Sequence, residues 1–263
     1  MIRRIESKKR IRDFCRRDSL RYVFHLGDLD DAEWHQSHYY AIENDGKIDE
    51  IALVYLGLSV PSVQLFGKVG SLGRACLDFI PVLPEEFHLH CHNEDIPLLE
   101  RDLEFGEGGE LYRMLWRGFP KGMKNSVFET RMIGPAQLKD LVELLEVAFP
   151  DTWFEPHQLS KAVFSGCYLD GRLVACAGFH VHSPREGVGA LGSIATHPGF
   201  RGRGLAAAAT IRLLEESREI TPLLALNVQV TNTPALALYR KLGFEDVFRY
   251  RELSARQGRP RLA

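Results

Sequence analysis

The hydrophobic pattern of this chain is clearest in its second half, where stretches with a period of two alternate with stretches of helical period. Apolar residues recur at helical spacing from Leu138 to Phe149, so a helix is expected between Pro135 and Pro150. Asp170-Gly171 favours a hairpin turn between two strands. The strands expected in this half are 127–132, 163–169, 172–181, 190–196, 223–230 and 246–253.

The first half contains the same kinds of element in a less regular order. A basic amphipathic helix is expected over 7–17, and Asp45-Gly46 is expected to turn between two strands. The expected strands are 38–44, 49–56, 62–66, 87–91 and 110–116, with short helices over 72–79 and 95–102. The stretch Pro120 to Lys124 is the expected linker. It divides the chain into an N-terminal α/β domain, 1–120, and a C-terminal domain, 121–263.

Composition narrows the class of protein. The 263 residues are 45% hydrophobic and 26% charged, which is typical of a globular chain and excludes a disordered or fibrous one. A formal net charge of -2 gives no overall attraction to nucleic acid or to an anionic membrane. Without an apolar leader or a run of 18 apolar residues, a cytoplasmic protein is expected. Nothing in the pattern indicates an oligomeric state.

Candidate chemistry lies between Leu191 and Ala209. Gly202 and Gly204 allow positive φ and close approach of a ligand to the backbone, and a helix is expected from Leu205 to Glu219. The first N–H groups of a helix have no partners within the helix and favour an anion. Because Arg201 and Arg203 add charge, we expect this stretch to bind a diphosphate.

Two nucleotide-binding motifs fit this stretch poorly. A Walker loop requires Lys after its last glycine, whereas Leu205 follows Gly204. A dinucleotide-binding turn would follow its strand directly and have an acidic residue about 20 positions later. Here Pro198 and Arg201 intervene, and no acidic residue occurs between Glu219 and Glu245.

Two motifs resemble those of the GNAT acyltransferase superfamily. Residues 201–206, Arg-Gly-Arg-Gly-Leu-Ala, fit its Arg/Gln-x-x-Gly-x-Gly/Ala signature, and residues 232–244 are similar to its last helix, which ends in Gly-Phe. The resemblance covers about residues 126–255. It implies an α/β (α+β) fold with a mixed, mostly antiparallel sheet and flanking helices. The N-terminal half is compatible with a degenerate copy of that fold, as in the glycine N-acyltransferases.

The resemblance also implies a cosubstrate, acetyl-CoA, and the residues that bind it. The strand before the signature would bind pantetheine through its backbone, the amides of the signature would bind pyrophosphate, and Asn232 would contact the cofactor arm. The implied cofactor-binding residues are Ile194, Ala195, Thr196, Arg201, Gly202, Arg203, Gly204, Leu205, Ala206 and Asn232. No metal is implied.

Tyr239 is the implied catalytic residue. A phenol is protonated at neutral pH and can donate to a departing thiolate; the alternative is a tyrosine of the core. The position at which some family members have a glutamate base is Ala190. Deprotonation is therefore left to water, to the acceptor's own pKa, or to His180, His182 or Glu186.

The expected function is acyl transfer, of acetyl above all, from coenzyme A to a primary amine by direct attack. The acceptor is a small-molecule or peptide amine that the sequence does not specify. The alternatives are a non-catalytic acetyl-CoA-binding module that regulates a partner, and an interaction protein with a relic of the diphosphate site.

His88, His90 and His92 alternate along one expected strand and would lie on one face. Three imidazoles on one face can bind zinc. The expectation is instead a solvated face, with Leu89 and Cys91 pointing inward.

Overall fold

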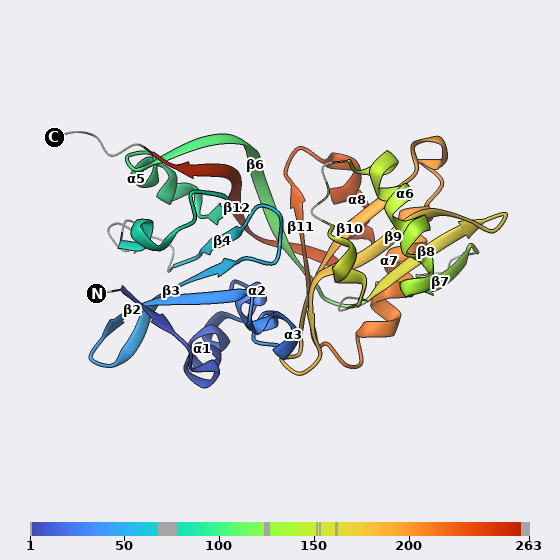
Figure 1. Cartoon of the computed structure of the whole chain (residues 1–263). Coiled ribbons are helices and arrows are strands. Elements are labelled where there is room, and N and C mark those ends of the chain that lie inside the picture. The colour runs from blue at the N-terminus through green and yellow to red at the C-terminus, as the bar shows by residue number, and fades with distance from the viewer. Residues whose placement is uncertain are drawn as a thin grey trace. The chain divides into compact units, whose positions relative to one another are not determined.

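The computed structural model describes residues 2–67, 78–123, 127–150, 152, 154–160 and 163–258. Its contacts divide the chain into two units. Unit 1 comprises residues 1–113, 229–231 and 247–263, and unit 2 comprises residues 114–228 and 232–246. The units therefore do not follow a single cut of the chain, because the last segment belongs to the first unit (Figure 1).

The elements of unit 1 come mainly from the first half of the chain. In order they are β1 (Ile2–Ile5), α1 (Lys8–Cys15), α2 (Val23–Gly27), α3 (Asp31–Trp34), β2 (Ser37–Asn44), β3 (Lys47–Tyr55), β4 (Ser62–Leu65), β5 (Glu86–Cys91), α5 (Ile96–Leu99) and β6 (Leu103–Trp116). Most of β12 (Phe244–Gln257) joins them: Arg251 to Arg256 pair antiparallel with Cys91 to Glu86 of β5.

The elements of unit 2 follow in sequence. They are β7 (Glu129–Ile133), α6 (Leu138–Ala148), β8 (Phe164–Leu169), β9 (Arg172–Ser183), β10 (Val188–Thr196), α7 (Leu205–Ser217), β11 (Leu223–Gln229) and α8 (Thr233–Lys241). Short 3-10 turns at Pro135–Gln137, Pro156–Ser160 and Pro198–Phe200 connect them.

The two units repeat one strand topology. In unit 1, β1, β2, β3 and β4 pair antiparallel in chain order, and β5 then pairs parallel with β4. In unit 2, β7, β8, β9 and β10 do the same, and β11 pairs parallel with β10. Each half of the chain therefore forms a mixed, mostly antiparallel sheet with one parallel pair.

Helices cover both faces of the unit 2 sheet. Leu141, Leu144 and Leu145 of α6 pack in one core cluster with Phe164 of β8. The next residue, Ser165, points to the opposite face and donates a hydrogen bond to the Ala209 carbonyl of α7, at 2.6 Å. The sheet is therefore buried on both sides, which fixes its strands in place.

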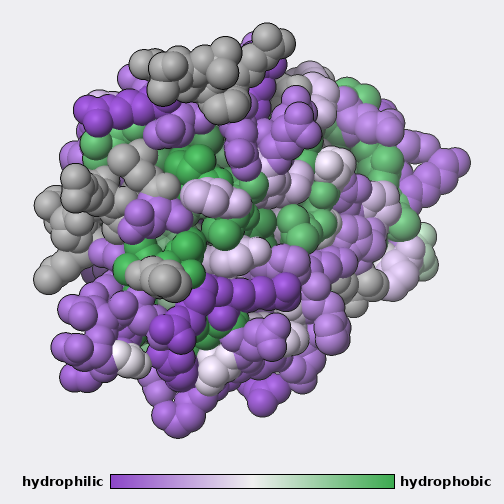
Figure 2. Space-filling model, turned by 60° about the vertical axis from the view of Figure 1, so that its left-hand side comes forward, coloured by the Kyte–Doolittle hydropathy of each residue, from purple (hydrophilic) through white to green (hydrophobic). Residues whose placement is uncertain are grey.

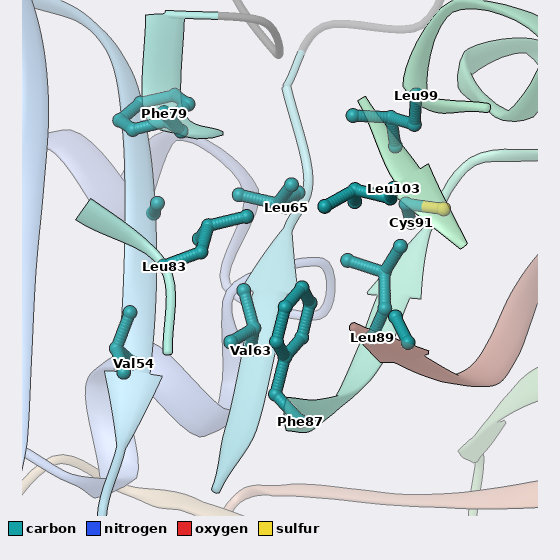
Figure 3. Close-up of a cluster of buried hydrophobic side chains, with 12 residues drawn as sticks. Val54, Val63, Leu65, Phe79, Leu83, Phe87, Leu89, Cys91, Leu99 and Leu103 are labelled. Carbon is teal, nitrogen blue, oxygen red and sulfur yellow. The ribbon is translucent and has the colours of Figure 1, made fainter. Parts of the chain in front are cut away.

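The core of unit 1 gathers apolar side chains from β3, β4, β5 and the segments around them (Figure 3). Val63 and Leu65 of β4 lie beside Phe87 and Leu89 of β5 in this cluster. Phe79 and Leu83, which come before β5 in the chain, complete this cluster.

Several predicted boundaries were wrong because long-range pairing extends the strands. β1 was not predicted, and β6 begins at Leu103 rather than Glu110. β12 runs to Gln257, whereas the expected strand ends at residue 253. The helix expected over 72–79 lies mostly outside the described residues.

The expected solvated histidine face is also wrong. His90 and His92 are each only 2% exposed, and Leu89 and Cys91 on the other face are fully buried. β5 lies between β4 and β12, so both of its edges are paired. The histidine face is covered by aromatic rings, because His90 stacks on Tyr250 and His92 packs edge-on against Phe66. Among the described residues, no cluster of His, Cys, Asp or Glu is arranged to hold a metal ion.

Hydrophilic residues cover most of the described surface on the face drawn in Figure 2, with apolar residues in smaller areas between them. Over the described part of the chain, every helix is too short or too polar to cross a membrane.

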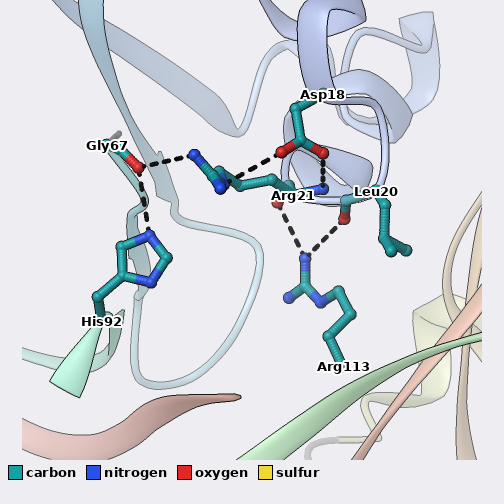
Figure 4. Close-up of polar contacts among 6 residues, drawn as sticks. All are labelled: Asp18, Leu20, Arg21, Gly67, His92 and Arg113. Carbon is teal, nitrogen blue, oxygen red and sulfur yellow. Dashed lines mark hydrogen bonds and ion pairs between the residues drawn. The ribbon is translucent and has the colours of Figure 1, made fainter. Parts of the chain in front are cut away.

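A buried arginine organises the polar interior of unit 1. Arg113 is fully buried, and its guanidinium donates to the carbonyls of Leu20 and Arg21, at 3.2 and 3.0 Å (Figure 4). Four aromatic rings surround the guanidinium at 5.2 to 5.5 Å from their centroids: Phe24, Phe66, Phe248 and Tyr250. Cation–π attraction and the two carbonyls offset the cost of burying this charge.

Arg113→Ala is expected to lower the free energy of unfolding by about 3 kcal/mol, because it leaves a cavity and two carbonyls without their donor. Arg249 is the matched control. It also lies over an aromatic ring, Tyr112, but its side chain is 53% exposed, so Arg249→Ala should cost less than about 1 kcal/mol. Urea denaturation of both variants tests this difference. Equal losses would show that the aromatic surroundings of Arg113 contribute little.

Candidate active site

The candidate site of unit 2 begins where two parallel strands separate. β10 and β11 pair from Val188 with Leu223 to Leu191 with Leu226. Both strands continue beyond this register, β10 to Thr196 and β11 to Gln229. Up to Leu191 every β10 residue is buried, whereas Gly192, Ile194 and Thr196 are partly exposed. The edge of β10 that faced β11 is therefore open from Gly192 onward.

A β-bulge lies in the same part of β10. Gly192 pairs with Gly178 and Ala195 with Cys176, so Ser193 and Ile194 stand opposite the single residue Ala177 of β9. Ser193 has a φ of 48°, which is uncommon for a residue with a side chain. Bulges increase the local twist and bend the strand that carries them. The bulge thus turns β10 away at the point where its pairing with β11 ends.

The predicted diphosphate loop follows β10 and leads into α7. Gly202 and Gly204 have φ values of 77° and 81°, and a Cβ on either glycine would meet no described atom within 4 Å. Gly204 caps α7 without a side-chain hydrogen bond from any described residue. The first amides of α7 therefore have no side-chain acceptor among the described residues and retain their capacity to bind an anion.

The two arginines of this loop differ in their contacts. Arg201 donates through Nε to the Thr196 carbonyl and through a terminal nitrogen to the Ala148 carbonyl, at 3.3 and 3.1 Å. Its side chain thus ties the loop to the end of β10 and to α6. Arg203 is exposed, with its guanidinium over the Phe200 ring, so it is the arginine better placed to meet an anion.

Asn232 is the residue that caps α8. Its Oδ1 accepts a hydrogen bond from the Ala235 amide at 3.2 Å. Asn232 comes three residues after the end of β11. The start of α8 therefore lies near the same edge of the sheet as the loop that follows β10.

Tyr239 lies two turns into α8 and is 7% exposed. Its ring packs edge-on against Phe244 at 6.0 Å, and its hydroxyl has no hydrogen bond to the described residues. Burial raises the pKa of Tyr239 above its usual range, so the phenol remains protonated around neutral pH.

The three candidate bases lie in different surroundings. His182 stacks on Phe179 and is 2.9 Å from Thr221 Oγ1, and Glu186 is 3% exposed. His180 is accessible and lies against β10, because a Cβ on Gly192 would be 2.1 Å from its ring. Ala190, which occupies the position where a glutamate base was considered, is buried. Of these residues, only His180 lies at the point where β10 and β11 separate.

The corresponding position of unit 1 is filled by protein groups. The parallel pair of β4 and β5 ends at Leu65 with Cys91. Just beyond this pair, side chains donate hydrogen bonds to the backbone. His92 Nε2 and a terminal nitrogen of Arg21 both donate to the Gly67 carbonyl, at 3.2 and 3.1 Å (Figure 4). Asp18 holds the Arg21 guanidinium at 3.3 Å.

Sequence comparison relates this part of the chain to a known family. Residues 128–244, somewhat less than half of the chain, match the sequence model of the acetyltransferase (GNAT) family. This segment is therefore similar to the acetyltransferases of that family. A mycothiol acetyltransferase from Thermobifida fusca (strain YX) is 35% identical over 121 residues. That match covers 42% of this chain and 36% of the relative, so the chain matches about a third of that protein's length.

Solved structures extend the likeness in fold to the whole chain. A tandem GNAT protein from the clavulanic acid biosynthesis pathway has a TM-score of 0.59 at 12% identity and covers 99% of both chains. A GNAT-family acetyltransferase from Colwellia psychrerythraea has a TM-score of 0.57 at 11% identity, over 97% of this chain and 99% of that one. A Drosophila protein reaches 0.72 at 13% identity, over 96% and 97%. At these identities the likeness shows the fold alone, and it agrees with the topology repeated in both units.

The contact between His180 and Gly192 was missed by sequence reasoning. The sequence shows a histidine on one strand and a glycine on the next, but their register depends on a shift in pairing. Ala190 pairs with Val181 and Leu191 with Phe179, so His180 is an extra residue on β9, which no local pattern reveals. The only signal was the presence of glycine in an otherwise apolar strand, which often marks a bulge or a close approach.

Gly204→Ala tests the open loop against a matched control. Gly171 has a similar φ of 78° and also has no described atom within 4 Å of a Cβ, but it lies in the hairpin turn between β8 and β9. Each alanine should cost about 1 kcal/mol of stability through backbone strain. Only Gly204→Ala should weaken coenzyme A binding, by roughly tenfold or more, in calorimetric titration. Equal affinity of both variants for coenzyme A would show that the diphosphate does not bind at the loop that contains Gly204.

Proposed function

We propose that the protein transfers an acetyl group from acetyl-CoA to a primary amine, and that residues 121–263 contain the machinery for this reaction. The observation that carries the proposal is the open edge of β10 leading directly to the uncapped start of α7. These two features suit the two parts of the cosubstrate, an extended amide arm and a diphosphate.

The residues fit the cosubstrate as follows. Partly exposed Ile194 and Thr196 would offer backbone groups to the pantetheine arm, with Ala195 between them. The amides of residues 201–206 would bind the diphosphate with the help of the Arg203 side chain, while Arg201 holds the loop in shape. Asn232 would use the amide nitrogen opposite its capping oxygen to contact the arm.

Acetyl-CoA supplies an activated acyl group, so the protein has to position the amine and assist the departing sulfur. Tyr239 is proposed as the general acid, because burial keeps its phenol protonated. Donation of that proton makes coenzyme A leave as a thiol rather than a thiolate. The acceptor is a small-molecule or peptide amine, and we infer nothing narrower about it here.

Tyr239→Phe is expected to lower kcat by about 10²-fold, because it removes the proton donor while keeping the ring. The dissociation constant for acetyl-CoA should stay unchanged. The measurement is the release of free thiol from acetyl-CoA against a panel of amines. Tyr168→Phe is the control, since Tyr168 is also a buried tyrosine of unit 2 but packs under Arg131.

Two outcomes would contradict the proposal. A normal kcat in Tyr239→Phe would remove this residue from the mechanism. Tight binding of acetyl-CoA without thiol release by the wild type, over the whole panel, would favour a binding module that regulates a partner.

A further inference from the structure

We propose that His180 is the proton acceptor of the reaction, taking a proton from the amine nitrogen as that nitrogen bonds to the acetyl carbon. This inference rests on the proposed acetyl transfer and supplies the group that the alanine at position 190 does not provide. It follows from the position of one imidazole ring of β9 beside Gly192 of β10.

The ring edge that bears Nε2 lies against Gly192. A Cβ on Gly192 would be 2.1 Å from both Nε2 and Cδ2 of His180. Any residue larger than glycine would therefore displace the imidazole. Gly192 is also the first β10 residue beyond the register shared with β11. Nε2 thus lies where the strands begin to separate.

The reacting end of the cosubstrate should reach the same place. Its diphosphate would bind at the loop after Thr196, and its arm would run back along the open edge of β10. A strand rises about 3.3 Å per residue, so the edge from Thr196 to Gly192 spans about 13 Å. The thioester, at the far end of the arm, then lies near Gly192 and His180.

The His180 imidazole is in the neutral form that a proton acceptor requires. The side chain of His180 is exposed. An accessible imidazole is mostly neutral at pH 7, so Nε2 or Nδ1 has a free electron pair. An amine nitrogen becomes far more acidic as it acquires positive charge by bonding to a carbonyl carbon, so a weakly basic imidazole suffices.

His180 and Tyr239 together account for every proton that moves in the reaction. The neutral amine forms a C–N bond with the acetyl carbon, and one N–H proton passes to His180. The C–S bond breaks with its electron pair on sulfur, which takes the Tyr239 proton. The imidazolium then returns a proton to the Tyr239 phenolate through solvent. The products are the amide and free coenzyme A, and both side chains are restored.

The neighbouring His182 offers a matched control. It lies two residues further along β9, but it is stacked on Phe179 and is 2.9 Å from the Thr221 hydroxyl. His180→Ala should lower kcat by about 10²-fold and leave the dissociation constant for acetyl-CoA unchanged. Added imidazole should restore part of the rate in His180→Ala and have no effect on His182→Ala or Tyr239→Phe.

The outcomes separate this inference from the proposed function. A wild type that releases no thiol with any amine refutes the proposed function and the role of His180 with it. An active wild type with an unchanged kcat in His180→Ala refutes only the role of His180. A loss of rate in His180→Ala that imidazole does not restore also overturns it, because a structural defect is not repaired by a free base.

Discussion

The end of the β10–β11 pairing at Leu191 and Leu226 is the constraint on which the candidate site depends. Up to that pair, the two strands are paired with each other and their backbone groups are used by the sheet. Beyond it, the bulge at Ser193 turns β10 away and leaves its edge open. The loop, the start of α7 and the start of α8 all follow at the same edge, so the site that we propose depends on one local irregularity.

The two units use the same topology for different purposes. In unit 2 the separated strands leave backbone groups available for a ligand. In unit 1 the carbonyl of Gly67, just beyond the corresponding parallel pair, already accepts hydrogen bonds from Arg21 and His92. The Arg113 guanidinium among its aromatic rings adds to this packed interior. In unit 1, the hydrogen bonds at the end of the parallel pair therefore stabilise the fold.

Local chemistry was sufficient to predict the turns and the loop. Asp45-Gly46 and Asp170-Gly171 both have positive φ, as expected of two-residue hairpin turns. Gly202 and Gly204 also have the predicted backbone conformation. Contacts between distant segments were not predictable in this way. The burial of His90 depends on β12, more than 150 residues later, and the place of His180 depends on a shift in register.

The return of β12 to unit 1 has a consequence for how the chain folds during synthesis. Residues 247–257 leave the ribosome after the whole of unit 2, yet they pair with β5 and supply Tyr250 to the rings around Arg113. The N-terminal sheet must therefore wait, with the edge of β5 unpaired, until the rest of the chain has been made. The first unit to be synthesised is in this sense the last to be completed, and chaperones would meet it with an exposed strand edge.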